Sequence, residues 1–242
     1  MMLQIKACIF KQLWQVWNNK KKLFLGFLLN LIAIFMAVHN LNLILGDKYN
    51  YQTIILLYFV LWLVYNSLMM IGEIVNEIRT SGTASQIFLS SCKISKYTLI
   101  QVITRTVVSI LFVGILSVCY NIIVKNISFS WLYSFFIIVS IGVFALIGVG
   151  YIIESVSMYL RNKTLIFWFK LMMVYLIIKS DDNWYIPFVK CKIMLTALFL
   201  NEGEDYCFVK DDLGILCVNA LVWFLLGYVV YKYVADKNYL IE

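Results

Sequence analysis

The chain has 242 residues, of which 63% are hydrophobic and only 14% are charged, and its mean hydropathy is +0.87. A soluble domain of this length would carry more charge, so the composition excludes an ordinary soluble protein. The formal net charge of +7 comes from lysines and arginines that flank apolar runs. This placement is typical of contact with anionic lipid headgroups, so membrane lipid is an expected partner and nucleic acid is not.

The N-terminal segment 3–19 has apolar side chains at helical spacing with polar ones between them. Trp14 and Trp17 would lie at headgroup depth, so we expect an amphipathic helix in the membrane interface. The same pattern also fits an N-terminal extension of the first span. The apolar run after this segment is too long for a signal peptide and lacks a small-residue cleavage site, so we expect it to be retained.

Several apolar runs are close to the roughly 20 residues that a helix needs to cross a bilayer. We therefore predict an all-α membrane protein, a single domain with six transmembrane helices. The expected spans are residues 23–45, 51–74, 104–124, 131–153, 162–180 and 213–234. In the first of them, Asn30 is expected to face other helices, because an amide is costly against lipid.

The fourth span, 131–153, contains the small residues Gly142, Gly148 and Gly150. Small residues let two helix backbones approach closely, so this span is expected to pack tightly against a neighbour. Plain lipid-exposed sequence is the alternative. Residues 154–163 are then expected to form a loop on the inner side.

The second span runs directly into a charged segment, Gly72–Ser91. Glu73, Glu77 and Arg79 lie within its first eight residues, and the helix is expected to end near Gly82, because glycine readily takes the left-handed conformation that ends a helix. We therefore predict that this helix leaves the membrane and turns sharply.

A second, shorter helix is expected after this turn. Thr83 and Gln86 have the spacing of a capping box, and the apolar run 87–89 follows them. The pattern favours a short helix that lies along the membrane surface. An ordinary amphipathic loop between two spans is the alternative. Arg105 then lies at the start of the third span, where it is expected to snorkel back to the interface.

The fifth span is the weakest, because its apolar part is short and contains Lys170. Residues 164–178 would reach only about 22 Å as a helix, less than the roughly 30 Å thickness of the hydrocarbon core. A lysine near mid-bilayer is costly, so Lys170 is expected to face protein or a water-filled cavity. If this segment failed to cross, the C-terminus would face the opposite side.

Residues 180–212 form a long acidic loop in this arrangement. Within it, 186–200 is apolar but too short to cross, which predicts a short re-entrant or surface helical hairpin on the outer side. Cys191 and Cys207 lie in this loop, and a disulfide between them stays open. Most lysines and arginines flank the opposite side, which places both termini in the cytoplasm.

No enzymatic motif is present in the sequence. The chain lacks the GxxxxGK[ST] phosphate-binding loop and the HExxH metalloprotease motif. Its six cysteines lack metal-ligand spacing, and the single histidine, His39, lies in an apolar run. We therefore expect no enzymatic activity, no metal site and no cofactor on this chain.

The stretch NEIRTSGTASQIFLSS resembles the cytoplasmic motif of type-2 ABC transporter permeases, in which an acidic–basic pair precedes Gly-Thr, Gln and Leu. The resemblance implies that this segment is a coupling helix that docks onto an ATPase subunit. It also makes 3–19 an elbow helix and 186–200 an outer gate. Relatives usually have an acid before the Gln, where this chain has Ser85, so no ionic contact is expected at that point. The residues expected at the contact are Glu73, Glu77, Arg79, Gly82, Thr83 and Gln86.

The resemblance further implies a multi-pass subunit of an ABC exporter in a bacterial cell membrane, with an antimicrobial peptide, a drug or another amphipathic or lipidic cargo. A separate ATPase subunit would bind ATP and Mg. Because six helices are few to enclose a path, a second copy or a paralogue is expected to pair with this chain, and Lys170 and Asn30 are the candidates for lining the path. A non-transporting immunity or sensor protein that binds a peptide is the alternative.

Overall fold

The computed structural model describes residues 51–80, 93–124, 129–160, 163–180, 183–200 and 210–237, together with single residues between positions 6 and 36. Over these residues the chain is all-helical. Three of the described helices are long and apolar enough to cross a membrane, with candidate spans at Ile94–Ile115, Trp131–Leu160 and Asp211–Ala235. The protein is therefore an all-α chain with the character of a membrane protein.

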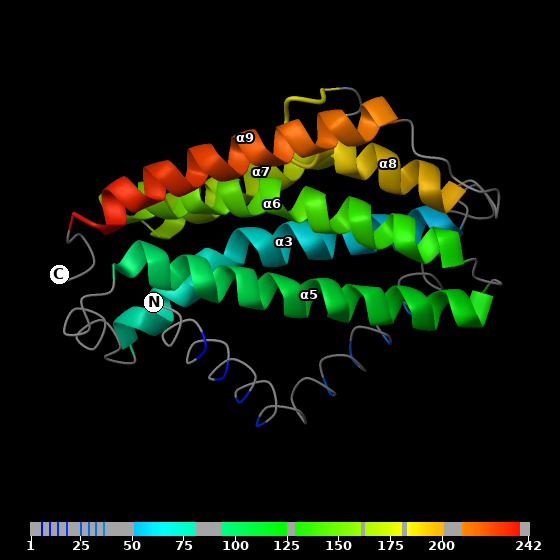
Figure 1. Ribbon diagram of the computed structural model, residues 1–242, viewed down its shortest axis with the longest axis horizontal. Coiled ribbons are helices and arrows are strands. Elements are labelled where there is room, and N and C mark those ends of the chain that lie inside the picture. Colours follow the sequence, from blue (N-terminus) through cyan, green and yellow to red (C-terminus); the bar gives the residue numbers. More distant parts are fainter. Residues whose placement is uncertain are drawn as a thin grey trace.

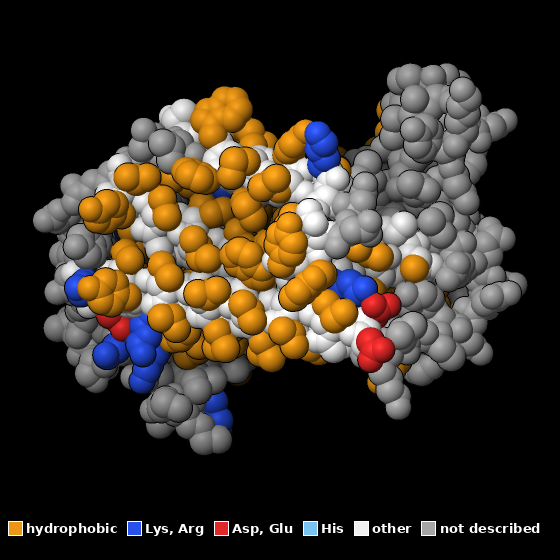
Figure 2. Space-filling model, turned by 90° about the horizontal axis from the view of Figure 1, so that it is seen from above, with side chains coloured by type: hydrophobic (Ala, Val, Ile, Leu, Met, Phe, Trp, Pro, Cys, Tyr) orange, Lys and Arg blue, Asp and Glu red, His pale blue; other side chains and the backbone are white. Residues whose placement is uncertain are grey.

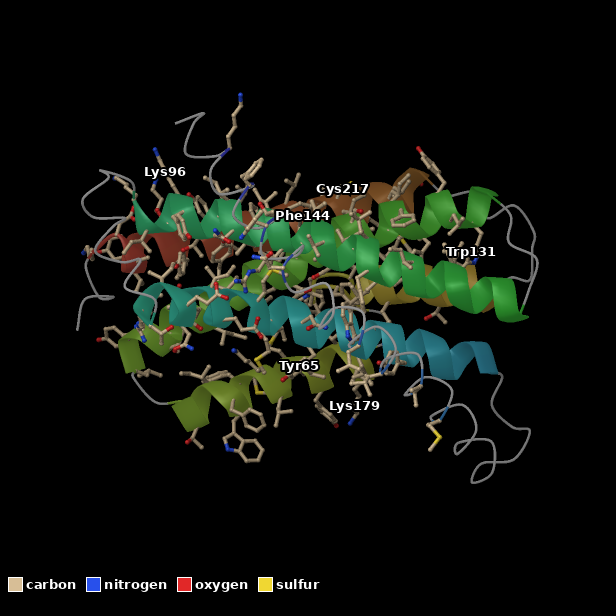
Figure 3. All side chains as sticks on the ribbon, turned by 90° about the horizontal axis from the view of Figure 1, so that it is seen from below. Tyr65, Lys96, Trp131, Phe144, Lys179 and Cys217 are labelled. Carbon is tan, nitrogen blue, oxygen red and sulfur yellow. The ribbon has the colours of Figure 1, made fainter. Side chains whose placement is uncertain are left out.

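Long helices lie side by side along the longest axis of the molecule (Figure 1). α6 is central, because it packs against each of the other helices described here. Lys96 and Trp131 mark opposite ends of this bundle, with Phe144 between them (Figure 3). The helices are α3 (Tyr51–Thr80), α5 (Ile94–Val124), α6 (Phe129–Leu160), α7 (Lys163–Lys179), α8 (Val189–Leu200) and α9 (Lys210–Ala235).

The most extensive helix contact joins α6 to α9, and glycines permit it. A Cβ atom on Gly148 would overlap the backbone carbonyl of Trp223, and one on Gly227 would overlap the backbone of Gly148. The two backbones thus meet directly, as the small residues of 131–153 predict. We call this contact, centred on Gly148 and Gly227, the glycine seam.

Hydrophobic side chains cover the outside of the bundle as well as its core. Along α9, Leu221, Leu225 and Val229 are each more than half exposed. Figure 2 shows the side of the molecule on which α9 lies. Hydrophobic side chains gather across the middle of this side, and charged side chains lie mainly toward the two ends of the bundle. This distribution suits a bundle whose middle is surrounded by lipid tails.

Two helices extend beyond their predicted bounds. α5 begins at Ile94 rather than near 104, because Ile94, Thr98 and Val102 are buried at helical spacing and hold the extra turns against the bundle. α6 continues to Leu160, so the predicted loop at 154–163 is wrong over most of its length. Glu154, expected in that loop, lies inside the helix and is buried.

The helical hairpin predicted at 186–200 is a single short helix, α8, which turns precede. It begins just after Phe188, which has a positive φ of 71°. The Lys192 ammonium donates to the carbonyl oxygens of Ile178 at 2.9 Å and Ser180 at 2.6 Å, which ties α8 to the end of α7. Asn219 of α9 donates to the carbonyl of Trp184 at 2.6 Å, so the segment before α8 is also fixed to α9.

Cys191, at the start of α8, is a free and fully buried thiol that contacts the small side of α6 at Gly142. Burial raises the pKa of this thiol well above its usual value. Cys191 therefore does not pair with Cys207 in this structure and serves as a small apolar residue. Cys207 itself lies outside the described residues.

Several predicted features fall mainly on residues that the structure does not describe. Within the predicted helix 3–19, the described residues Phe10 and Trp14 are helical and exposed. Within the predicted span 23–45, the same holds for Leu25 and Leu29. Asn30 and the predicted surface helix within 81–92 lie outside the described residues, so these features stay predictions.

Candidate ligand pocket between α3, α6 and α7

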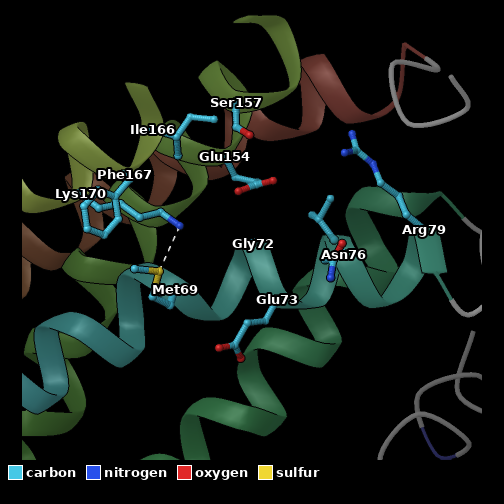
Figure 4. A pocket seen from close by; sticks show the side chains of 11 residues that line it. Met69, Gly72, Glu73, Asn76, Arg79, Glu154, Ser157, Ile166, Phe167 and Lys170 are labelled. Atoms are coloured by element: carbon cyan, nitrogen blue, oxygen red, sulfur yellow. Dashed lines mark hydrogen bonds between the residues drawn. The ribbon is translucent and has the colours of Figure 1, made fainter. Parts of the chain in front are cut away.

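A cavity of about 390 Å³ lies between α3, α6 and α7. Charged side chains from all three helices reach it, together with apolar side chains of α7 (Figure 4). Its volume is within the range of pockets that hold small ligands or the headgroup of a larger one. Its lining includes Gly72 and Arg79 from α3, Glu154 from α6, and Ile166, Phe167 and Lys170 from α7.

Gly72 opens the space in which two opposite charges face each other. A Cβ atom at Gly72 would lie 3.0 Å from Oε2 of Glu154 and 3.5 Å from Nζ of Lys170. Both charged groups therefore point at the same patch of α3 backbone, one from α6 and the other from α7 (Figure 4). A larger residue at position 72 would fill the gap between them.

Glu154 is the buried charge of this pocket, with a relative exposure of 7%. Its position follows from α6, which carries it one turn past Gly150 toward the α3 side of the bundle. Among the residues that the structure describes, none donates a hydrogen bond to this carboxylate or forms an ion pair with it within 4 Å. The opposite charges of Lys170 and Arg79 act on it across the pocket. A carboxylate removed from water without a hydrogen-bond donor is nevertheless costly, so a feature of this kind needs a reason.

Lys170 is the cation nearest to Gly72, and its ammonium has a weak partner. Nζ lies 3.3 Å from the thioether sulfur of Met69, which is a poor acceptor (Figure 4). Lys170 thus faces protein and a cavity, as predicted from its cost at mid-bilayer. Arg79 lines the end of the pocket away from Lys170 and adds a second positive charge.

A second charged cluster lies beside the pocket, where α3 meets α5. Nη2 of Arg105 is 2.6 Å from Oε2 of Glu77, and Nη1 is 3.7 Å from Oε2 of Glu73. Arg105 thus has two acidic partners one turn apart on α3, and its snorkelling to the membrane interface stays a prediction. We call these three residues the α3–α5 clamp.

The clamp links the two helices that flank residues 81–92, which lie outside the described part of the chain. α3 ends at Thr80, next to the predicted break, and α5 begins at Ile94. Of the residues predicted to contact an ATPase, Glu73, Glu77 and Arg79 lie together on the last turns of α3. The others, Gly82, Thr83 and Gln86, lie outside the described residues.

Glu154 and Gly72 were not predicted to belong to a site. An available signal was that no glycine or proline follows Glu154 before Leu160, so the helix had no cause to end at 153. Gly72 carried no signal of its own, since its role depends on which side chains face it from other helices.

Comparison of the chain with protein-family models, with curated proteins and with solved structures finds no match. The pocket has a volume that can hold a small group and charged side chains of both signs that can bind it. In the described part of the chain, no three His, Cys, Asp or Glu side chains gather in a group that could hold a metal ion.

Proposed function

We propose that this chain is the membrane-spanning subunit of an ATP-binding-cassette transporter that exports an amphipathic or lipidic cargo. The observation that carries the proposal is the α3–α5 clamp. It joins the last two turns of α3 to α5 about three turns past its start, so it links the two helices on either side of the segment that resembles a permease coupling motif. A separate ATPase subunit binds ATP and Mg and docks on residues 73–91.

The clamp explains how force would pass from the ATPase into the membrane. Arg105 ties α5 to two successive turns of α3, so a push on the segment between these helices moves both as one unit. α3 also forms one wall of the charged pocket, next to Gly72. Movement of α3 therefore changes the pocket that faces α6 and α7.

The finer architecture of this proposal has six spans in a bacterial cell membrane, with both termini in the cytoplasm. Besides the three long apolar helices, α3, α7 and the predicted segment 23–45 complete the set. The short helix α8 belongs to the outer gate, where it is tied to α7 by Lys192. Two copies of the chain, or the chain and a paralogue, enclose the path.

The experiment that tests this proposal is the Gly82→Val substitution in the full chain. A β-branched residue at a position expected to need positive φ distorts the turn and displaces the docking surface. We expect Gly82→Val to insert normally but to co-purify with little ATPase activity from the cells that make it. Asn50→Ala, far from this turn in sequence, is the control and should keep full activity.

Equal ATPase activity with the Gly82→Val and Asn50→Ala proteins would contradict docking at this segment. No ATPase activity with the unaltered chain would instead favour a non-transporting immunity or sensor protein that acts by binding a peptide.

A further inference from the structure

We propose that the pocket between α3, α6 and α7 binds a phosphoethanolamine group, with its primary ammonium on Glu154 and its phosphate on Lys170. The proposal does not rest on ATP-driven transport, because it concerns binding by this chain alone. Nothing in the proposed transport function requires a zwitterion at this place.

The buried carboxylate of Glu154 calls for a cationic hydrogen-bond donor. It has lost most of its contact with water, and none of the described residues donates a hydrogen bond to it. A primary ammonium supplies both a positive charge and N–H groups, which form the stronger, charge-assisted class of hydrogen bond. A quaternary ammonium has the charge but no N–H group, so it satisfies the carboxylate less well.

The ammonium of Lys170 can bind an anion at its own end of the gap between Glu154 and Lys170. It donates to the thioether sulfur of Met69, a weak acceptor that a phosphate oxygen would readily replace. Two bases, Lys170 and Arg79, and two acids, Glu73 and Glu154, line the pocket, so its charges suit a zwitterion, which carries one charge of each sign. Arg79 acts here through its charge, from the far end of the pocket.

Gly72 sets the spacing between the two sites. The carboxylate and the ammonium approach the same point above the α3 backbone, at 3.0 Å and 3.5 Å from where a Cβ would be. The gap that this leaves is therefore short, and it favours a compact zwitterion such as phosphoethanolamine, in which two carbon atoms and an ester oxygen join the nitrogen to the phosphorus. Glycine inside a helix lowers stability by roughly 1 kcal/mol relative to alanine, so its presence here is consistent with a space kept for a ligand.

The apolar part of the pocket favours a lipid as the carrier of this group. Ile166 and Phe167 line the cavity from α7, and Phe167 is half exposed. Next to it, Trp168 is also largely exposed on the same helix. Acyl chains would therefore leave the pocket along the apolar surface of α7, where lipid tails are expected in any case.

The test measures binding of short-chain phospholipids to the purified full chain in detergent by titration calorimetry. Dioctanoyl phosphatidylethanolamine is compared with the choline and glycerol analogues, which lack the N–H groups and the positive charge, respectively. We expect the ethanolamine lipid to bind about tenfold tighter than either, because one charge-assisted hydrogen bond is worth at least that factor. Equal affinities for the three lipids would overturn the proposal.

Substitutions assign each charge its role. Glu154→Gln should abolish the preference for ethanolamine over glycerol, whereas Lys170→Met should weaken both lipids about equally. Lys179→Met is the matched control, because it removes an exposed lysine of the same helix outside the pocket, and it should change neither affinity. A preference for ethanolamine that survives Glu154→Gln would also overturn the proposal.

Gly72→Ala tests the pocket without removing a charge. The added methyl group would occupy the space between Glu154 and Lys170, so we expect it to weaken ethanolamine lipid about tenfold while thermal unfolding shows a fold at least as stable. Unchanged affinity in a folded Gly72→Ala protein would contradict binding in this gap.

A competition experiment then distinguishes a phospholipid headgroup from free phosphoethanolamine as the ligand. Free O-phosphoethanolamine is added in competition with the ethanolamine lipid. Displacement of the lipid would show that the zwitterion alone suffices and that a soluble ligand can use the site. Binding of the lipid without such displacement would assign the site to a phospholipid, whose acyl chains on α7 contribute to affinity.

Discussion

α6 packs against its neighbours in two different ways. On the side of α9, the glycine seam brings two backbones into direct contact at Gly148 and Gly227. On the side of α3 and α7, the contact is interrupted by a cavity of about 390 Å³ that holds Glu154 and Lys170. One face of a single helix is thus closed and apolar, and the other is open and charged.

The two sides of α6 therefore differ in their roles: the contact with α9 stabilises the bundle, and the side of α3 and α7 holds the candidate binding site. Helices in a membrane gain little from the hydrophobic effect, so close packing of backbones is a main source of their association. The glycine seam supplies that contact. A buried carboxylate and an open cavity lower stability. The pocket between α3, α6 and α7 therefore depends on the stability that the contact between α6 and α9 supplies.

The largest expected effect comes from breaking the glycine seam. Gly148→Ala places a methyl group onto the carbonyl of Trp223, which backbone atoms cannot avoid, so it should lower the free energy of unfolding by about 3 kcal/mol. Gly214→Ala, on α9, has no atom within 4 Å of the new methyl group and should instead be stabilising by up to about 1 kcal/mol. Denaturant unfolding in mixed micelles measures both. Equal stability of the two variants would show that the seam is not tightly packed.

The contact between α9 and the segment before α8 can also be weakened, at Asn219 in the first half of α9. Asn219→Leu removes the donor that binds the carbonyls of Trp184 at 2.6 Å and Ile186 at 3.5 Å. A fully buried carbonyl left without a donor costs roughly 1–3 kcal/mol, and these bonds are only partly buried, so unfolding should become easier by about 1 kcal/mol. The amides of the segment before α8 should exchange hydrogen faster, whereas those of α3 should not change. Unchanged exchange before α8 would argue that other contacts fix this segment.

An effect of similar size tests whether the pocket charges depend on each other. Glu154→Gln or Lys170→Met alone leaves the other charge without its opposite, whereas the double variant removes both. A double-mutant cycle on unfolding free energies should give a coupling of about 1 kcal/mol between the two positions. Additive effects would mean that each charge is satisfied independently of the other.

The smallest expected effect is that of opening the α3–α5 clamp. Arg105→Gln should lower stability by less than about 1 kcal/mol, because the side chain of Glu77 is 57% exposed and solvent screens the pair. The effect should fade at high salt. Lys96→Gln, an exposed position on the same helix, is the control and should show no salt-dependent change. A loss from Arg105→Gln that persists at high salt would point to packing rather than charge.

Much of the fold follows from local sequence. The apolar runs fix where helices form, because the hydrocarbon core leaves few other ways to satisfy the backbone. The glycines of 131–153 indicate a close helix contact, although not which helix makes it. The cost of Lys170 at mid-bilayer is enough to predict that it faces protein or a cavity, which its place in the pocket confirms.

Other features were decided only when the helices came together. α6 continues past Ile153 because its next turns pack against the bundle, and this carries Glu154 into the interior. Arg105 turns toward α3 because Glu73 and Glu77 lie within its reach. Gly72 matters through the two charges that meet above it, which come from helices distant in sequence. Periodicity along one helix determines which of its faces is apolar, but the partner of each side chain depends on how separate helices are placed in space.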